Sequence, residues 1–368
     1  MKILIAAGGT GGHIYPGLAI AEKIKTENPG AEIVFIGSMV GMEKNIIPQY
    51  GYPIEYIRVR GFERKASLET LAAIKGIFDG LSDAKKLIKK HQPDLVIGTG
   101  GFTAGPLLLI ASRRKIKTMI HEQNAYPGKT NLMLGTRVNR IAISFKEAEK
   151  YFPQERTFLA GNPVRSDYHQ IDRSELRKNL NLSDTQKMIL IMGGSQGAGS
   201  INQSALSLIA SYKDQDDRVI YHLTGKDQYE SIKKEVDHLG LSPSGHVFVD
   251  AYSNEVHRLL GAADLVISRS GAMSVAEIQA VGVPSILVPY PLAAGNHQEF
   301  NARVITDPGG GVLIKDKELT GARLIQTVES LLEDEKKCQM MSQITKKQSI
   351  INAGDRIYAQ IKKLMENE

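Results

Sequence analysis

Two glycine-rich segments, one at the start of the chain and one near its middle, have the composition of phosphate-binding turns. Gly8-Gly9-Thr10-Gly11-Gly12-His13 follows the apolar run 2–7 and precedes a helical pattern. Gly193-Gly194-Ser195-Gln196-Gly197-Ala198-Gly199 follows the apolar run 188–192 and also precedes a helical pattern. A glycine turn between a buried strand and a helix lets a phosphate approach the bare N–H groups at the helix N-terminus. Two such turns predict two similar α/β halves that face one cleft and hold a pair of ligands.

The spacing of these glycines disfavours two common classes of nucleotide-binding protein. Neither turn is a G-x-G-x-x-G motif followed by an acid at the end of the next strand, because Glu32 begins the second strand. Neither turn matches G-x-x-x-x-G-K-[ST], so NAD binding and P-loop hydrolysis are both disfavoured. A turn that serves only close packing is the alternative for either copy taken alone.

Polar residues of the first half could move a proton. His13 lies where a helix begins, and the positive end of the helix dipole disfavours imidazolium, so a neutral His13 could accept a proton. His121-Glu122-Gln123-Asn124 ends the apolar run 117–121, and the carboxyl ends of parallel strands border a ligand crevice. Gly98-Thr99-Gly100-Gly101-Phe102 is a third glycine turn, suited to a pyrophosphate. A capping histidine and a buried polar network are the structural alternatives.

Residues of the second half are suited to a nucleoside and a sugar. Ser270 and Gly271 begin a helix, and Glu277 on its second turn could accept both hydroxyls of a ribose. The alternative for Glu277 is a solvent-facing helix residue. His297-Gln298 and Asn301 follow another strand end and offer partners for sugar hydroxyls. No Asp-x-Asp follows a strand, so no metal and no other cofactor is expected, and helix N-termini would neutralise a leaving diphosphate.

The composition is that of a globular protein with two domains. The chain has 368 residues, of which 42% are hydrophobic and 23% are charged. The single Cys338 excludes a disulfide framework and a cysteine-based metal site. The sequence begins at once with a strand, and no apolar run reaches the ~18 residues of a membrane span, so we expect a cytoplasmic protein.

The charge of the chain is uneven. Residues 1–164 hold 23 Lys and Arg against 14 Asp and Glu, a net charge of +9, whereas the remaining residues have a net charge of −3. The basic half should prefer an anionic partner, which could be nucleic acid, anionic lipid or a phosphorylated substrate. No helix-turn-helix, zinc finger or aromatic ribonucleoprotein motif is visible, so nucleic acid is not expected as a partner.

Strand and helix patterns alternate along the chain, which predicts parallel, doubly wound sheets. The predicted strands are 2–7, 32–37, 54–58, 94–98, 117–121, 140–144, 157–160, 188–192, 218–223, 246–249, 264–268 and 284–288. The predicted helices are 14–27, 68–90, 104–113, 199–211, 226–238, 254–261 and 271–281. The domain boundary is expected at Gly161-Asn162-Pro163, because the residue before a proline is kept out of regular helix. This gives domains 1–163 and 164–351, with an amphipathic helix in 352–368 that crosses back to the first domain.

Two stretches combine apolar and basic residues, as surfaces that touch an anionic membrane do. One is 68–90, with Leu71, Ile74, Ile77, Phe78 and Leu81 followed by Lys85, Lys86, Lys89 and Lys90. The other is 113–117, which reads Arg-Arg-Lys-Ile-Lys. The alternative for 68–90 is a packed surface helix with a solvated face.

The motifs above, in this order along nearly the whole chain, carry a family resemblance. To them are added Gly161-Asn162-Pro163-Val164-Arg165 and Ser268-Arg269-Ser270-Gly271-Ala272 through Glu277. The chain resembles the MurG family, the N-acetylglucosamine transferases that convert lipid I to lipid II in peptidoglycan synthesis. The resemblance implies a B-type glycosyltransferase fold, in which two Rossmann-like doubly wound domains face a cleft. It also implies that UDP-GlcNAc is held mainly by the second domain, and that the C4 hydroxyl of a lipid-linked acceptor in the first domain attacks with inversion at C1.

His13 is the first choice for the general base, because it lies at the turn that faces the cleft and should be neutral at pH 7, and Glu122 at the end of a neighbouring strand is the second. The resemblance implies the substrate contacts. Ribose hydroxyls would bind Glu277, and uracil would bind backbone near Val249. One departure is Gly295-Asn296-His297-Gln298-Glu299, where relatives often carry two glutamines, so the role of His297 is open. The implied substrate contacts are Thr10, Gly11, Gly12, Asn124, Arg165, Ser195, Val249, Ser270, Gly271, Ala272, Met273, Ser274, Glu277 and Gln298.

The expected partners are UDP-GlcNAc, lipid I and the anionic inner leaflet of the cell membrane. The expected location is therefore peripheral, on the cytoplasmic face of that membrane. The expected biological role is in cell-wall growth and cell division. Two other enzymes on the same scaffold are alternatives: a UDP-GlcNAc 2-epimerase, which needs no lipid acceptor, and a diacylglycerol glycosyltransferase. A third alternative is a non-catalytic membrane protein that binds sugar nucleotides.

Overall fold

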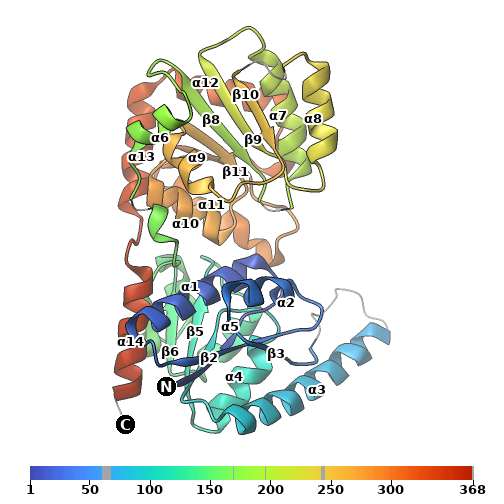
Figure 1. The fold of residues 1–368 in the computed structure, drawn as a ribbon, viewed down its shortest axis with the longest axis vertical. Helices are drawn as coiled ribbons and strands as arrows, with labels where there is room; N and C mark the ends of the chain where they lie inside the picture. The colour runs from blue at the N-terminus through green and yellow to red at the C-terminus, as the bar shows by residue number, and fades with distance from the viewer. Residues whose placement is uncertain (60–67, 169, 195, 242–244, 367–368) are drawn as a thin grey trace. The chain divides into compact units, whose positions relative to one another are not determined.

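The chain folds into two compact units, each built on one parallel sheet (Figure 1). Unit 1 comprises Met1–Val164 and Ile350–Glu368, and unit 2 comprises Arg165–Ser349. The structure is a computed structural model that describes residues 1–59, 68–168, 170–194, 196–241 and 245–366. The two doubly wound sheets predicted from the alternation of strands and helices are confirmed.

Unit 1 contains a seven-stranded sheet in the order β3-β2-β1-β4-β5-β6-β7, with every pair parallel. Helices cover both faces, so the central strands are apolar along their length. The strands are β1 (Lys2–Ala6), β2 (Glu32–Gly37), β3 (Ile54–Tyr56), β4 (Leu95–Gly98), β5 (Lys117–Glu122), β6 (Arg140–Ile143) and β7 (Thr157–Leu159). The α-helices are α1 (Gly11–Glu27), α2 (Glu43–Ile46), α3 (Leu68–His91), α4 (Ala104–Arg113), α5 (Lys129–Gly135) and α14 (Ala353–Glu366).

The C-terminal helix α14 belongs to unit 1 and packs against α1, as Figure 1 shows. Its apolar face contributes Ile357 and Ile361 to the same buried cluster as Ile14 and Leu18 of α1. The end of the chain thus completes one face of the sheet that the beginning of the chain forms. Each fully buried aliphatic side chain of this kind stabilises the fold by roughly 1.5–3 kcal/mol.

Unit 2 contains a six-stranded parallel sheet in the order β10-β9-β8-β11-β12-β13. The last strand, a three-residue segment at the sheet edge, was not predicted from the sequence. The strands are β8 (Lys187–Met192), β9 (Arg218–Leu223), β10 (Val247–Asp250), β11 (Leu265–Ser268), β12 (Ser285–Leu287) and β13 (Gly311–Leu313). The α-helices are α6 (Arg173–Asn179), α7 (Gly199–Ser211), α8 (Tyr229–His238), α9 (Val256–Ala262), α10 (Ala272–Val281), α11 (His297–Thr306), α12 (Gly321–Leu332) and α13 (Glu335–Lys347).

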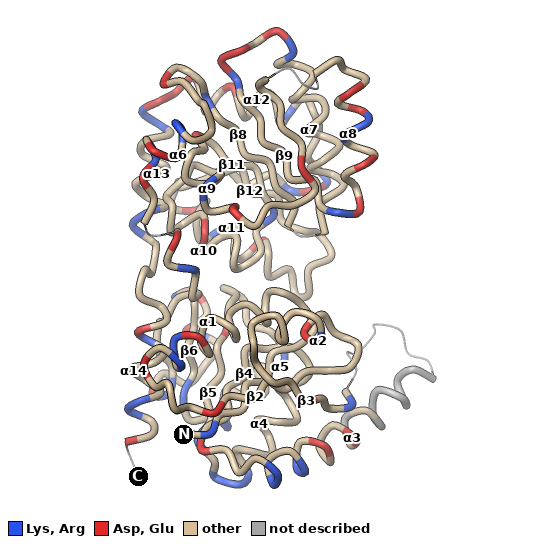
Figure 2. Tube along the Cα trace, in the orientation of Figure 1, with Lys and Arg blue, Asp and Glu red and all other residues tan. Residues whose placement is uncertain are grey.

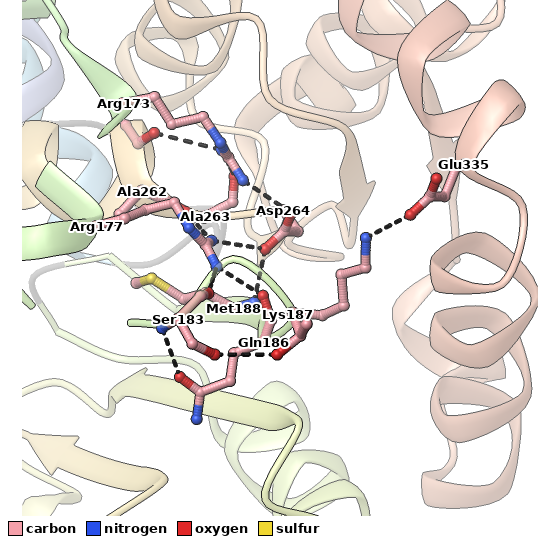
Figure 3. A network of polar contacts seen from close by, with 12 residues as sticks. Arg173, Arg177, Ser183, Gln186, Lys187, Met188, Ala262, Ala263, Asp264 and Glu335 are labelled. Carbon is pink, nitrogen blue, oxygen red and sulfur yellow. Dashed lines mark hydrogen bonds and ion pairs between the residues drawn. The ribbon is translucent and has the colours of Figure 1, made fainter. Parts of the chain in front are cut away.

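An arginine network ties α6 to the amino ends of β8 and β11, and Figure 3 shows it from close by. Arg177 donates to Asp264 Oδ2 at 3.1 Å and to the carbonyls of Ser183 and Gln186 at 2.8 and 2.6 Å. Arg173 donates to Asp264 Oδ1 at 2.8 Å, but its side chain is 45% exposed, whereas that of Arg177 is 11% exposed. This network lies at the end of the sheet opposite to the glycine turns, and it holds the first helix of unit 2 in place.

We expect Arg177→Met to lower the free energy of unfolding of unit 2 by about 3 kcal/mol, because the half-buried Asp264 loses its buried partner. Hydrogen exchange at the amides of β8 and β11 in the full chain measures this loss. Arg173→Met is the matched control, and it should cost about 1 kcal/mol or less because that arginine is far more exposed. Equal losses in the two variants would contradict the assignment.

Candidate active site

In unit 1 the loops after β1 and β4 touch through bare glycine backbone. A Cβ on Gly101 would lie 2.3 Å from the Gly8 carbonyl oxygen, and one on Gly8 would lie 2.7 Å from Thr103 Oγ1. Gly101 also has a φ of +77°, which side chains rarely allow. The strand order reverses between β1 and β4, and ligands of doubly wound sheets bind outside the carboxyl ends of strands at such a point.

The N-terminus of α1 opens at this same point. Thr10 is the N-cap residue and makes no capping hydrogen bond through its side chain, and the first turn contains no acidic residue. Gly11 and Gly12 form the first turn, so no bulky side chain shields its N–H groups. The structure therefore brings the predicted contacts Thr10, Gly11 and Gly12 together at a helix end suited to an anion.

His13 is the third residue of α1, and its ring is fixed from two sides. Its Nδ1 lies 3.1 Å from the Gly8 carbonyl oxygen, which can only accept a hydrogen bond. A Cβ on Gly100 would lie 2.7 Å from His13 Cδ2, so the ring packs on backbone that must be glycine. A proton held on Nδ1 leaves Nε2 as the basic nitrogen of the neutral ring.

Glu122, the second candidate for the base, is buried and surrounded by donors. Its Oε1 accepts from the backbone N–H of Asn124 at 2.9 Å and from Asn124 Nδ2 at 3.1 Å. Its Oε2 accepts from the Gly128 N–H at 3.0 Å and from Asn131 Nδ2 at 2.9 Å. Four donors fill the lone pairs of the carboxylate, so the geometry favours a role in which Glu122 shapes the loop that carries Asn124.

The buried His121 links two of the sequence motifs in unit 1. Its Nε2 lies 3.0 Å from the Gly161 carbonyl oxygen, and its Nδ1 accepts from Gln123 Nε2 at 3.0 Å. Burial lowers the pKa of His121 to about 4, so the ring is neutral at pH 7. Asn162 Nδ2 donates to the Gln123 carbonyl at 3.0 Å and completes the connection. For His121, the structure supports the buried polar network that was the structural alternative.

One buried acid in unit 1 was missed from the sequence. Glu43, at the start of α2, is 0% exposed and accepts a hydrogen bond from the Gly9 N–H at 3.0 Å. It also accepts from the backbone N–H and the hydroxyl of Ser38, at 2.7 and 2.8 Å. The available signal was an acid in a glycine-containing loop just after a strand end, but it has no characteristic spacing.

In unit 2 the loops after β8 and β9 cross through glycine backbone. A Cβ on Gly197 would lie 2.1 Å from the Thr224 carbonyl oxygen, and one on Gly225 would lie 2.2 Å from the Gly197 nitrogen. The turn leads into α7, whose N-cap Ala198 has no side-chain cap and whose first turn has no acid. Ser195, predicted to contact the donor, lies outside the described residues.

A second helix N-terminus opens at the end of β11. Gly271 is the N-cap residue of α10, and the first helical residues Ala272, Met273 and Ser274 include no acid. The buried Ser270 donates its hydroxyl to the Gln298 carbonyl at 2.8 Å, and Gln298 Oε1 accepts from the Tyr290 N–H at 2.9 Å. These bonds bring two predicted contacts, Ser270 and Gln298, side by side and hold the loop before α11 against α10.

Glu277 lies on α10 beside a tyrosine that the sequence did not single out. It forms a side-chain hydrogen bond with Tyr168, which is 4% exposed and ends the short 3₁₀ helix η4 (Ser166–Tyr168). The guanidinium carbon of Arg165 lies 5.9 Å from the centre of the Tyr168 ring. Burial raises the pKa of Glu277 to about 7, while the Tyr168 hydrogen bond and the charge of Arg165 act to lower it.

Val249 lies within the edge strand β10. The side chain of Val249 packs on the core of unit 2. The even-numbered residues of β10 form the backbone hydrogen bonds to β9, so the N–H and C=O of Val249 point to the open edge of the sheet. Neighbouring strands are about 4.8 Å apart, so β10 is about 14 Å from β11. The following loop, by contrast, reaches the Glu277 neighbourhood, because Arg165 donates to the Asn254 carbonyl at 3.4 Å.

Arg269 ties the end of β11 to neighbouring elements instead of extending toward a ligand. Its guanidinium donates to Asp316 Oδ1 at 2.5 Å and to Ser200 Oγ at 3.0 Å, near the start of α7.

His297 Nδ1 lies 2.7 Å from the Ala294 carbonyl oxygen, so His297 fixes the turn before α11. Within the part of the chain that the structure describes, no group of three or more His, Cys, Asp or Glu is arranged to hold a metal ion.

The fold of the two units agrees with comparisons to known proteins. The model of the glycosyltransferase family 28 N-terminal domain matches residues 3–143, and that of the family 28 C-terminal domain matches residues 188–357. These two matches define the chain as a glycosyltransferase and cover most of its length.

The relatives are more specific. The UDP-N-acetylglucosamine--N-acetylmuramyl-(pentapeptide) pyrophosphoryl-undecaprenol N-acetylglucosamine transferase of Acetivibrio thermocellus is 44% identical, over 100% of this chain and 99% of its own. The crystal structure of Acinetobacter baumannii MurG is 27% identical with a TM-score of 0.79, over 98% of this chain and 99% of that one. The chain therefore belongs to this family of N-acetylglucosamine transferases, and the resemblance drawn from the motifs is confirmed.

A UDP-GlcNAc 2-epimerase from Neisseria meningitidis, solved with UDP-GlcNAc bound, has the same fold. It is 15% identical with a TM-score of 0.68, over 99% of this chain and 100% of that one. At this identity the likeness concerns the fold alone. The epimerase alternative therefore receives no further support from it.

Proposed function

We propose that this enzyme transfers GlcNAc from UDP-GlcNAc to the C4 hydroxyl of the MurNAc of lipid I, giving lipid II and UDP. The observation that carries the proposal is the 44% identity, over the whole chain, to a transferase named for this reaction. Release of UDP from UDP-GlcNAc only when lipid I is present tests it. Conversion of UDP-GlcNAc to its C2 epimer without a lipid acceptor would instead support a 2-epimerase, and no turnover with lipid I would support a sugar-nucleotide sensor.

Unit 2 is proposed to bind the donor. The uncapped N-termini of α7 and α10 offer N–H groups to the diphosphate, and their partial positive charge neutralises the leaving UDP without a metal. Glu277 accepts the two ribose hydroxyls. The uracil is assigned to the backbone of the loop 251–254, which reaches Arg165, in place of Val249 on the edge strand. The sugar is assigned to Gln298 and Ser195.

Unit 1 is proposed to bind the acceptor and to supply the base. His13 Nε2 takes the proton of the C4 hydroxyl while the oxygen of that hydroxyl forms a bond to C1 of GlcNAc. The bond from C1 to the β-phosphate oxygen breaks, and its electron pair stays on the departing UDP. Attack opposite to the leaving group inverts C1. Thr10, Gly11, Gly12 and Asn124 line the same edge of the sheet as His13 and contact the substrates there.

Replacing the base is the first test of this mechanism. We expect His13→Ala to lower kcat by about 10²- to 10⁴-fold, because the attacking hydroxyl then keeps its proton. The acid limb of the pH–rate profile should disappear, and the affinity for UDP should stay nearly unchanged. Steady-state kinetics with lipid I measure all three. A variant that keeps its kcat and loses donor affinity would make His13 a phosphate-side residue.

Binding of UDP-GlcNAc should depend on pH through Glu277. Only the ionised carboxylate accepts both ribose hydroxyls, and its pKa in the empty protein is about 7, so affinity should fall as the pH falls. Between pH 8 and pH 6 we expect the Kd to rise about tenfold, one unit of pH being a factor of ten below the pKa. Isothermal titration calorimetry measures the Kd at each pH. The diphosphate diester of the donor does not itself titrate in this range, so a change in Kd reports on the protein.

Glu277→Gln is the matched control for that measurement. It should bind UDP-GlcNAc about 10-fold or more weakly at pH 8, as a charged hydrogen-bond partner contributes roughly 1.5–3 kcal/mol. Its Kd should also be nearly constant between pH 6 and pH 8. The same pH dependence in the variant and the natural protein would remove Glu277 from the site.

A membrane-facing role is proposed for one side of unit 1. Lys85, Lys86, Lys89 and Lys90 are exposed on α3, whose blue segments stand out in Figure 2, and Phe78 on the same helix is 67% exposed. Arg113 and Arg114 are exposed at the end of α4. The side chains of Leu71, Ile74 and Ile77 lie outside the described residues. None of the helices that the structure describes has the length and apolar character to cross a membrane. We therefore infer peripheral binding at the cytoplasmic face.

Substituting Lys85, Lys86, Arg113 and Arg114 with Gln should weaken binding to anionic vesicles, each charge contributing about 1 kcal/mol. The difference should shrink as salt rises, because the Debye length falls. Vesicle co-sedimentation measures it. Lys336→Gln with Lys337→Gln, on the exposed start of α13 in unit 2, is the control and should leave binding unchanged. Equal binding of all forms to anionic and neutral vesicles would contradict the proposal.

A further inference from the structure

The buried Glu43 and the candidate base His13 are attached to the same peptide group. The carbonyl of Gly8 and the amide of Gly9 belong to one planar peptide unit. His13 Nδ1 lies 3.1 Å from the Gly8 oxygen, and the Gly9 N–H donates to Glu43 Oε2 at 3.0 Å. The three groups therefore form a continuous chain of hydrogen bonds, from carboxylate through peptide to imidazole.

The carboxylate is held in place by backbone. Its Oε1 accepts from the Ser38 N–H and hydroxyl, and a Cβ on Gly41 would lie 1.9 Å from Oε2. A Cβ on Gly8 would lie 3.1 Å from Oε1, so the turn packs directly on the acid. All three of these hydrogen bonds come from neutral donors. Burying a carboxylate beside neutral donors is costly, and an apolar residue would fill this space at lower cost.

We propose that Glu43 is a positioning residue for the transfer reaction, and that it acts on His13 through the Gly8–Gly9 peptide. Hydrogen bonds in a chain polarise one another, so a carboxylate at the Gly9 N–H makes the Gly8 oxygen a stronger acceptor. A stronger acceptor holds the proton on Nδ1 and leaves Nε2 to take the proton of the acceptor hydroxyl. This inference rests on the proposed role of His13 as the base.

The arrangement corresponds to the acid–histidine pair of hydrolase triads with one peptide group inserted. In those triads the acid fixes the tautomer of the histidine and stabilises the imidazolium that forms. Here the negative charge of Glu43 is farther from the ring, so its effect is smaller but of the same sign. The other titratable group near the ring on α1 is Tyr15, and α2 carries Lys44. The remaining titratable residues of α1 lie at least two turns further along the helix: Glu22, Lys23, Lys25 and Glu27.

Glu43→Gln tests the proposal, because it keeps the shape of the side chain and removes its charge. Loss of the acid from a hydrolase triad costs about 10⁴-fold in kcat. With a peptide inserted we expect a loss of about 10- to 100-fold. The KM for UDP-GlcNAc should stay within about twofold, because the donor is assigned to unit 2. The acid limb of the kcat profile should move to lower pH, since imidazolium becomes less stable.

Two further variants separate positioning from packing. Ser38→Ala removes one donor to the same carboxylate but leaves the Gly9 bond, so its kcat should fall less than threefold, roughly the effect of one weakened hydrogen bond. Glu43→Asp keeps the charge and should retain more kcat than Glu43→Gln, even where thermal unfolding shows that both are destabilised.

The inference is overturned if Glu43→Gln and Ser38→Ala have the same kcat and the same acid limb. It is also overturned if Glu43→Asp and Glu43→Gln lose kcat equally while remaining folded. The parallel measurement on His13→Ala keeps the two proposals distinct. If that variant retains its kcat, the base assignment itself fails. If only the Glu43 variants retain theirs, His13 stands as the base without this carboxylate.

Discussion

The candidate site depends on the close approach of glycine backbone at the carboxyl ends of both sheets. In unit 1 the Gly101 position meets the Gly8 carbonyl, and in unit 2 the Gly197 position meets that of Thr224, at distances that no Cβ would allow. The helices α1 and α7 follow these contacts, and neither has a side-chain cap or an acidic residue in its first turn. The same approach in unit 1 brings the His13 ring onto Gly100 and its Nδ1 onto the Gly8 oxygen.

Burial then divides the polar residues by role. His121 and Glu122 are enclosed by partners and shape the loops around them, whereas Glu277 keeps part of its surface exposed beside Tyr168 and Arg165. His13 is also only partly buried, and its orientation is set by backbone. The two partly exposed residues proposed for the site thus each have a buried polar neighbour: Glu43 beyond the Gly8–Gly9 peptide for His13, and Tyr168 for Glu277.

The sequence predicted the two doubly wound sheets because buried parallel strands read as continuous apolar runs between helical patterns. It missed β13, a three-residue strand that begins in a run of glycines. It also left unassigned the helices α2, α5, α6, α11, α12 and α13. It located the glycine turns at the starts of α1 and α7, His13 in the first turn of α1, and the start of α10, because local spacing determines these positions. It could not reveal the contact of Glu43 with Gly9 or that of Tyr168 with Glu277, because these partners lie 34 and more than 100 residues apart in the sequence. The uracil contact implied near Val249 stays a prediction, and the loop 251–254 is proposed in its place because β10 lies at the sheet edge.

The most direct test of donor binding by unit 2 is a crystal structure of the protein with UDP-GlcNAc. We expect the diphosphate oxygens within hydrogen-bond distance of the N–H groups that begin α7 and α10, with the ribose hydroxyls on Glu277. We also expect uracil against the backbone of residues 251–254. A nucleotide held instead by the glycine turns of unit 1, with no contact to Glu277, would contradict the assignment of the donor to unit 2.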